Sequence, residues 1–361
     1  MTAADRNVQA GSGGRDSAAR LLDKFGYETV CFQTLQRGMN LWFSKRHLGM
    51  VGFVDAGRHW ITAGSPIADS DRIGNIAEEF ERFAHQRHRR VCYVCVESRN
   101  VKHLAAAGRG KLIIGAIPIW NPARWPDIIS RNARLRYQIA RAKRQCDEVI
   151  EITPSRAAGS ADINNLIGKW LSQRRLMPMR FLADPFILSD AGEHRRIFTL
   201  HRRNGPLTGL LAASPIPARR GMFIEQIVRA PHAPNGMVEL MIDHAMREFA
   251  LSCRHVTLGL VAGSQFASDH ENPWWARMAR YSARRWGGGL YRFGSLEQFR
   301  AALQPDTWEP VYAVADQSHI TIRALLAACR AMFRFPVFRF RHDENPAYLR
   351  PHSAGPDEWR N

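Results

Sequence analysis

The segment from Gly221 to Ala250, GMFIEQIVRAPHAPNGMVELMIDHAMREFA, decides the fold that the sequence predicts. Met222 to Val228 is rich in apolar residues and has the length of a strand. Apolar side chains recur at helical spacing from Met237 to Ala250, and prolines and the pair Asn235-Gly236 interrupt the chain in between. The segment therefore predicts a strand, a tight turn and an amphipathic helix.

A turn of this kind places the first N–H groups of a helix at the end of a strand. These groups have no partner within the helix, and the helix dipole adds partial positive charge there. A phosphate, a carboxylate or a developing oxyanion would be stabilised at such a position. The alternative is an ordinary strand-turn-helix connection without a ligand.

Length and charge limit the function further. The chain has 361 residues, which favours two structural units over one, and its formal net charge is +18. A surface this positive attracts polyanions, either nucleic acid or an anionic membrane face. No apolar run reaches the roughly 18 residues that a membrane span needs, and the polar N-terminus is not a secretory signal. We expect a cytoplasmic protein, peripheral on the inner face of the membrane if it binds lipid.

The cysteines do not predict a metal site. Cys92 and Cys95 have CxxC spacing, but they lie in the strand-like run VCYVCVES, and no second pair or nearby histidine completes a zinc set. Strand alternation would direct the two thiols to opposite faces. We expect core thiols in a reducing compartment and no bound metal.

The order of elements predicts two α/β units that repeat one plan. Residues 1–16 form a tail without structure, 17–152 the first unit, 153–316 the second unit with the active site, and 317–361 a basic amphipathic tail. The first unit is expected to begin with a helix from Ser17 and a strand from Thr29 to Phe32. In the tail, Ile320 to Phe340 interleaves apolar residues with arginine and has no acid, which fits either a membrane-surface segment or a helix packed on the protein.

One helix is expected to be strongly basic. The segment from Ser130 to Arg144 keeps Leu135, Ile139 and Ala142 for the core and has no acid. A helix face of a single charge sign favours binding to a phosphate backbone over a solvated surface. The candidate RNA-binding residues are Arg131, Arg134, Arg136, Arg141, Lys143 and Arg144.

With these elements placed, the sequence resembles the catalytic domain of lysylphosphatidylglycerol synthases and related aminoacyl-tRNA-dependent transferases, from about residue 25 to residue 315. The resemblance is carried by the basic helix and by four motifs in the family's order: WITAGSPIA from Trp60, EQIVRAPHAPNGMVELMI from Glu225, LGLVAGS from Leu258, and LYRFGSLEQFRAALQPDTWEPVYAV from Leu290.

The resemblance implies an α/β fold of two tandem GNAT-like acyltransferase units, with mixed central sheets flanked by helices. It implies transfer of an aminoacyl group from aminoacyl-tRNA, the co-substrate, to a hydroxyl of a lipid such as phosphatidylglycerol, with no further cofactor. The implied catalytic residues are Glu225, Gln226 and Arg229, and the implied substrate-binding residues are Asn235, Gly236 and Ser264.

One position departs from the family pattern. Gln226 occupies the place of the usual aspartate, and an amide cannot act as a general base. Either Glu225 takes that role, or the substrates differ, or the protein is an inactive homologue that binds RNA or membranes. Alternation gives Glu225 and Arg229 the same face, and Glu225 and Gln226 share a face only if a bulge intervenes. An acyl-CoA-dependent acyltransferase of the same fold is the remaining alternative, although its pyrophosphate loop is incomplete here.

Overall fold

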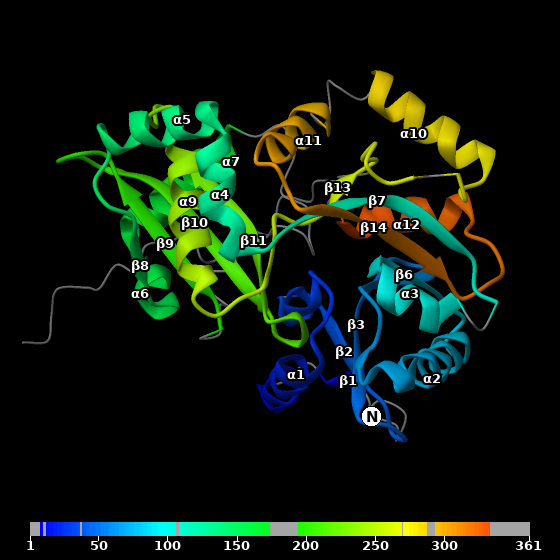
Figure 1. The fold of residues 1–361 in the computed structure, drawn as a ribbon. Helices are drawn as coiled ribbons and strands as arrows, with labels where there is room; N and C mark the ends of the chain where they lie inside the picture. Colours follow the sequence, from blue (N-terminus) through cyan, green and yellow to red (C-terminus); the bar gives the residue numbers. More distant parts are fainter. Residues whose placement is uncertain are drawn as a thin grey trace, which may run out of the picture.

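The computed structural model describes residues 8–9, 12–36, 38–105, 108–173, 194–268, 270–286 and 293–332. Its strands form a mixed, fourteen-stranded sheet that runs through two lobes (Figure 1). The strand order is β1-β2-β3-β4-β6-β14-β7-β12-β11-β10-β9-β8, with β5 paired to β3 and β13 paired to β7.

The first lobe follows the predicted order of helices and strands. Two helices that connect consecutive strands pack on one face of its sheet, and β4 and β6 are parallel. Its elements are β1 (Val8–Gln9), α1 (Ser12–Phe25), η2 (Cys31–Leu35), β2 (Asn40–Phe43), β3 (Gly49–Asp55), β4 (His59–Ala63), β5 (Ile67–Ala68), η3 (Ser70–Arg72), α2 (Ile73–His85), β6 (Arg90–Glu97), α3 (Ser98–Ala105) and β7 (Lys111–Trp120).

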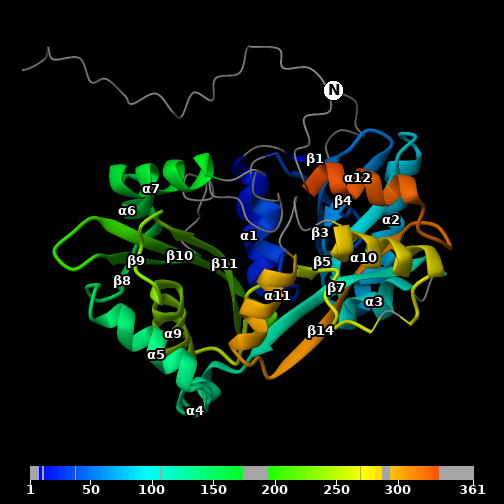
Figure 2. The ribbon, with the colours of Figure 1, turned by 90° about the horizontal axis from the view of Figure 1, so that it is seen from above.

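The second lobe repeats the plan around β11 and α9, and it also includes residues 122–152, which the sequence division placed in the first unit. Its elements are η4 (Pro122–Arg124), α4 (Trp125–Arg131), α5 (Ala133–Lys143), β8 (Ile150–Ile152), α6 (Pro154–Ala158), α7 (Ala161–Ser172), β9 (Arg196–His201), β10 (Leu207–Ile216), η5 (Pro217–Arg219), β11 (Gly221–Arg229), α9 (Met237–Ala250) and β12 (His255–Thr257). Helices α4, α5 and α9 cover one face of this sheet, and α6 and α7 cover the other (Figure 2).

The C-terminal elements return to the first lobe. They are β13 (Val261–Ala262), α10 (Trp274–Trp286), α11 (Phe293–Ala302), β14 (Thr307–Ala315) and α12 (Ile322–Met332). Strand β14, which the sequence division placed in the second unit, pairs antiparallel with β6 on one side and with β7 on the other. Its apolar side chains Val311, Ala313 and Val314 are buried there. Residues that are remote in sequence therefore complete the first lobe's sheet.

Two expected elements differ from the structure. Residues 29–32 do not form a strand, because a 3-10 turn begins at Cys31. All four side chains are buried, whereas a strand with one solvent-facing side would bury only alternate side chains. The basic helix is broken at Asn132, whose backbone leaves the helical region and whose side chain accepts a hydrogen bond from the Leu135 N–H at 3.0 Å. Arg131 therefore ends α4, and the other five basic residues follow on α5 or directly after it.

The CxxC thiols are buried and unpaired, as expected, but they do not face opposite sides. The pairing of β6 with β14 shifts register at Cys95, whose φ is 66°, and both Cys92 and Cys95 join the same apolar cluster. An extra residue in the strand explains why the alternation argument failed here.

The tail begins as a packed helix. In α12, Ala324, Ala327, Ala328 and Ala331 are buried against the first lobe, so the helix is packed on the protein, one of the two interpretations considered for the tail. The remainder of the tail, from residue 333, lies outside the described residues. The expectation that residues 1–16 have no structure is wrong where they are described, because residues 8–9 form β1 and α1 begins at Ser12 and not at Ser17. None of the described helices has the length and apolarity needed to cross a bilayer.

Candidate active site

The site is built where β11 and β12 separate. In these parallel strands, residues 221–223 pair with residues 255–257, and the pairing ends there. On its other side, β11 pairs with β10 as far as Arg229. Beyond Phe223, the edge of β11 that faces away from β10 is not paired to another described strand. A substrate can lie along such an edge and contact main-chain groups as well as side chains.

Strand β11 contains the bulge that the sequence argument required. Its register passes from Ile224 opposite Ala213 to Gln226 opposite Ala212, which leaves Glu225 as the extra residue. Because of the bulge, Glu225 and Gln226 both lie on the face where Val228 packs against α7. Ile224 and Ile227, in contrast, pack on the side of α9.

The bulge corrects the expectation that Glu225 and Arg229 share a face. Arg229 follows Ile227 in alternation and lies towards α5 and α9, opposite to Glu225. The three residues assigned to catalysis are therefore divided between the two faces of one strand. They can meet on one substrate only along the open edge of β11.

Glu225 is held by residues of both lobes. Its carboxylate accepts a hydrogen bond from Arg195 Nε at 2.6 Å and another from Gln33 Nε2 at 2.6 Å. The side chain of Glu225 is fully buried and that of Arg195 is 8% exposed, while Gln36 donates in turn to Gln33. With both oxygens engaged, Glu225 is suited to anchor the strand and the first lobe's η2 turn.

Gln226 differs from Glu225, because its amide oxygen accepts no hydrogen bond from the described residues. The residue is 7% exposed, and Oε1 has no hydrogen-bond partner in the described part of the chain. A buried acceptor without a partner costs about 1–3 kcal/mol, so it is a natural place for a substrate O–H or N–H group.

A cavity of about 430 Å³ opens at the N-terminus of α9. It brings together four residues that were singled out in the sequence: Arg229, Asn235, Gly236 and Arg141. The remaining walls come from α5, α9 and α11, with side chains of Gln138, Val238, Glu239 and Phe299. The cavity therefore joins the end of β11 to the basic helix.

Gly236 is required by this packing. It is the N-cap of α9 with φ of 87°, and a Cβ atom here would overlap the backbone carbonyl of Gln138, at 2.7 Å from its carbon. Only glycine combines that backbone conformation with such a close approach of α5.

The basic residues are distributed unevenly around the cavity. Arg134, Arg136, Lys143, Arg144 and Arg131 are exposed, and Arg141 is half-buried at the cavity wall. Arg136 donates to the carbonyl oxygens of Ile129 (3.0 Å) and Ser130, so it also closes the end of α4. The others form the exposed basic surface beside the cavity.

Ser264 lies elsewhere. It is buried in the turn after β13, where its hydroxyl accepts a hydrogen bond from the Phe266 N–H at 3.2 Å and its carbonyl accepts one from Arg280. It does not line either of the two cavities described here. Its role in substrate binding stays a prediction.

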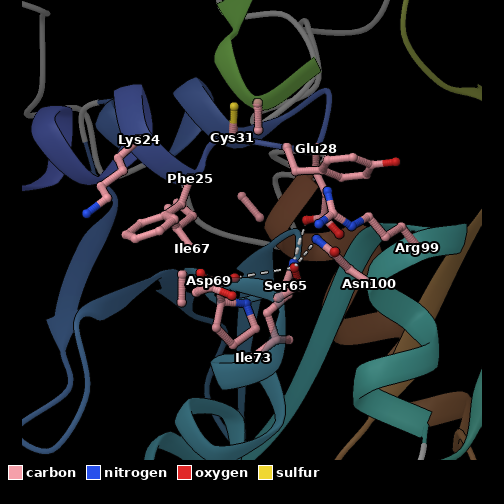
Figure 3. Close-up of a pocket in the computed structure, with 16 residues that line it drawn as sticks. Lys24, Phe25, Glu28, Cys31, Ser65, Ile67, Asp69, Ile73, Arg99 and Asn100 are labelled. Atoms are coloured by element: carbon pink, nitrogen blue, oxygen red, sulfur yellow. Dashed lines mark hydrogen bonds between the residues drawn. The ribbon is translucent and has the colours of Figure 1, made fainter. Parts of the chain in front are cut away.

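The first lobe has a cavity at the corresponding place, between β4 and α2 (Figure 3). It measures about 350 Å³, and its wall includes the turn of the WITAGSPIA motif. Glu28 accepts hydrogen bonds from the N–H groups of Ser65 (2.6 Å) and Glu97 (3.2 Å), and Asn100 donates to the Ser65 hydroxyl. Burial, helped by the neighbouring Glu97, raises the pKa of Glu28 to about 8. The motif thus shapes a turn around a buried carboxyl group.

Sequence reasoning missed Arg195 and Gln33, the two partners of Glu225. Gln33 follows directly after a segment that was expected to be a strand, and Arg195 lies between elements, so neither stood in a pattern that indicates a site. Only the packing of η2 against β10 brings Gln33 to the second lobe.

Comparison with known proteins agrees with this architecture. The family model for phosphatidylglycerol lysyltransferase, C-terminal, matches residues 19–315. The C-terminal domain assigned to a lysylphosphatidylglycerol synthetase from Agrobacterium fabrum is 19% identical, with a TM-score of 0.72 over 89% of this chain and 96% of that one. L-PGS from Bacillus licheniformis is 15% identical, with a TM-score of 0.73 over 88% and 95%. No curated protein matches the sequence.

At these identities the solved structures show the fold, and they confirm the expected α/β architecture with a mixed central sheet flanked by helices. Fold and family together indicate an acyltransferase. The match covers most of the chain, and the protein therefore belongs to the phosphatidylglycerol lysyltransferase C-terminal family.

Proposed function

We propose that this protein transfers an aminoacyl group from aminoacyl-tRNA to a hydroxyl group of a membrane lipid such as phosphatidylglycerol. The observation that carries the proposal is the cavity at the N-terminus of α9, which opens beside the basic helix α5. An anion-stabilising pocket next to a basic surface suits a ligand with a polyanionic body and a reactive end.

In this proposal the exposed arginines and Lys143 hold the acceptor stem of the tRNA. The esterified ribose enters the cavity, where Arg229, Asn235 and the first N–H groups of α9 surround it. Arg229 stabilises the negative charge that develops on the ester carbonyl oxygen.

The chemistry is a transesterification of an already activated ester. The lipid hydroxyl oxygen attacks the carbonyl carbon, the bond to the ribose oxygen breaks, and the hydroxyl proton ends on that leaving oxygen. Gln226 cannot accept the proton, but its free amide oxygen can accept a hydrogen bond and orient the attacking hydroxyl. Glu225, anchored by Arg195 and Gln33, fixes the bulge that presents Gln226.

The direct test supplies the purified protein with a mixed pool of labelled aminoacyl-tRNA and phosphatidylglycerol vesicles, and extracts the lipids for mass spectrometry. We expect a new lipid whose mass gives the amino acid. Arg229→Gln should lower the rate about 100-fold, as the loss of one oxyanion donor does. Arg254→Gln is the matched control, because Arg254 is also exposed but lies before β12, at the other end of α9. A parallel reaction replaces aminoacyl-tRNA with acyl-CoA as the donor. Product formed only in that reaction, or unchanged transfer by Arg229→Gln, would overturn the proposal.

Donor binding is tested separately by measuring affinity for tRNA as a function of salt. Arg134→Gln combined with Lys143→Gln should weaken binding and flatten the logarithmic salt dependence by roughly 0.7–0.9 per lost phosphate contact. Arg46→Gln with Arg58→Gln removes two exposed charges from the first lobe and serves as the control. Equal effects of the two pairs would show that net charge, and not α5, attracts the RNA.

A further inference from the structure

Helix α10 exposes a stripe of large apolar side chains to solvent. Trp274, Met278 and Tyr281 are 71%, 56% and 66% exposed. Their spacing of four and three residues places them on one face of the helix. Scattered exposed apolar residues are common, but three large ones in line on a single helix indicate a surface that meets something apolar.

Helix α12 has a similar stripe. Ile322 and Leu326 are 62% and 51% exposed and lie one turn apart, while the alanines of the opposite face are buried. Four alanines and Met332 of this helix therefore face the core, Leu325 is half-buried, and Ile322 and Leu326 face outwards.

The two helices cover the same face of the first lobe. Ala276 and the half-buried Trp275 of α10 belong to one apolar cluster with the buried alanines of α12 and with residues of β4, β6 and β14. Figures 1 and 2 show both helices on this lobe, away from α5 and α9. Their exposed stripes consequently lie on a common outer surface.

The exposed charges described on the two helices are of one sign, and Glu271, just before α10, is paired with Lys111. Arg277 on α10, and Arg323 and Arg330 on α12, are exposed. Neither residues 272–286 nor residues 317–332 contain an aspartate or a glutamate. Arginine, tryptophan and tyrosine side chains are enriched where proteins contact the boundary between anionic lipid headgroups and acyl chains.

We propose that the outer faces of α10 and α12, with Trp274, Met278, Tyr281, Ile322 and Leu326, dock the protein on an anionic lipid bilayer. The aliphatic members of the stripe favour a bilayer over RNA, because nucleic acid offers them no apolar phase whereas acyl chains do. This docking proposal rests on the proposed function, because an enzyme that modifies a membrane lipid has to reach that lipid in a bilayer. The docking itself is measured without any turnover.

The test is flotation of the full chain with vesicles of equal parts phosphatidylglycerol and phosphatidylcholine, and with vesicles of phosphatidylcholine alone. We expect binding to the anionic vesicles. The triple variant Trp274→Ser, Met278→Ser, Tyr281→Ser should lose about tenfold or more of this binding. Arg277→Gln with Arg323→Gln should lose about fivefold per charge, and the loss should shrink at high salt. The matched control is Leu251→Ser, which removes an apolar side chain that is 83% exposed near the end of α9.

A second measurement separates docking from catalysis. With a short-chain, water-soluble phosphatidylglycerol as acceptor, the triple variant should keep the transfer rate of the unmodified protein, and it should lose activity only on vesicles. Vesicle binding by the triple variant equal to that of the Leu251→Ser control would overturn the docking proposal, as would a loss of tRNA binding with vesicle binding retained. Absence of transfer to either acceptor by the unmodified protein would instead count against the proposed function, and the flotation result would still decide the docking.

Discussion

The ion pair between Glu225 and Arg195 gives the sharpest test of how the site is held. Glu225→Gln keeps the shape of the side chain but removes its charge, which deprives the Arg195 guanidinium, 8% exposed, of this counter-ion. Breaking a buried pair in this way costs about 3–5 kcal/mol, because the remaining charge stays desolvated. We therefore expect the free energy of unfolding to fall by about 3 kcal/mol or more.

A second Arg–Glu pair in the same lobe provides the control. Arg196 binds Glu151 through two nitrogens, at 2.7 and 2.5 Å, but the two side chains are 28% and 38% exposed. Since solvent screens this pair, Glu151→Gln should cost no more than about 1 kcal/mol. The two variants share the chemistry of the substitution and differ in burial.

The assay is equilibrium unfolding in urea, followed by circular dichroism, for both single variants. The double variant Glu225→Gln, Arg195→Met removes both charges, so it should recover part of the lost stability, which a double-mutant cycle reports as coupling. The explanation would be refuted if Glu225→Gln and Glu151→Gln had equal costs, or if the effects of Glu225→Gln and Arg195→Met were simply additive.

Two further predictions concern the two lobes separately. Gly236→Ala should destabilise α9 and lower the transfer rate, because its Cβ would meet the backbone of Gln138. The control is Gly57→Ala, at a similar φ of 80° but with open space around the Cβ, which should cost only about 1 kcal/mol of backbone strain. Thermal unfolding of the two variants measures the difference. Glu28 keeps its proton to about pH 8 when folded and loses it near its ordinary value of 4.5 when unfolded, so the folded state binds more protons between these values. The free energy of unfolding should therefore fall as pH rises from about 5 to 8, by up to about 1.4 kcal/mol per pH unit. In Glu28→Gln, the midpoint of urea unfolding should fall less steeply with pH than in the unmodified protein. An equally steep fall would mean that another group titrates.

The sequence by itself determined most of the local structure. The strand-turn-helix of residues 221–250 was predicted nearly to the residue, because Pro and Gly mark its turn and apolar side chains recur at helical spacing after it. The same apolar side chains of α9 pack against β10 and β11. Net charge, the basic segment and the motif order also indicated the class of protein. These are properties that a single chain segment carries without its neighbours.

Only the tertiary structure decided which residues meet. The bulge at Glu225 depends on how β11 pairs with β10, and it moved Glu225 away from Arg229 although their spacing predicted a common face. The same effect at Cys95 reversed the expectation for the two thiols. A one-residue insertion in a ladder changes every later side chain, and it is set by pairing with a strand that is remote in sequence.

Long-range packing decided the rest. Gln33 reaches Glu225 across the lobes, and β14 enters the first lobe's sheet between β6 and β7. The amphipathic pattern of α12 was evident in the sequence, but the pattern alone could not tell which face would be buried. Four alanines proved to face the core together with Met332, because alanines allow the helix to approach the sheet closely, whereas Ile322 and Leu326 were left on the outside.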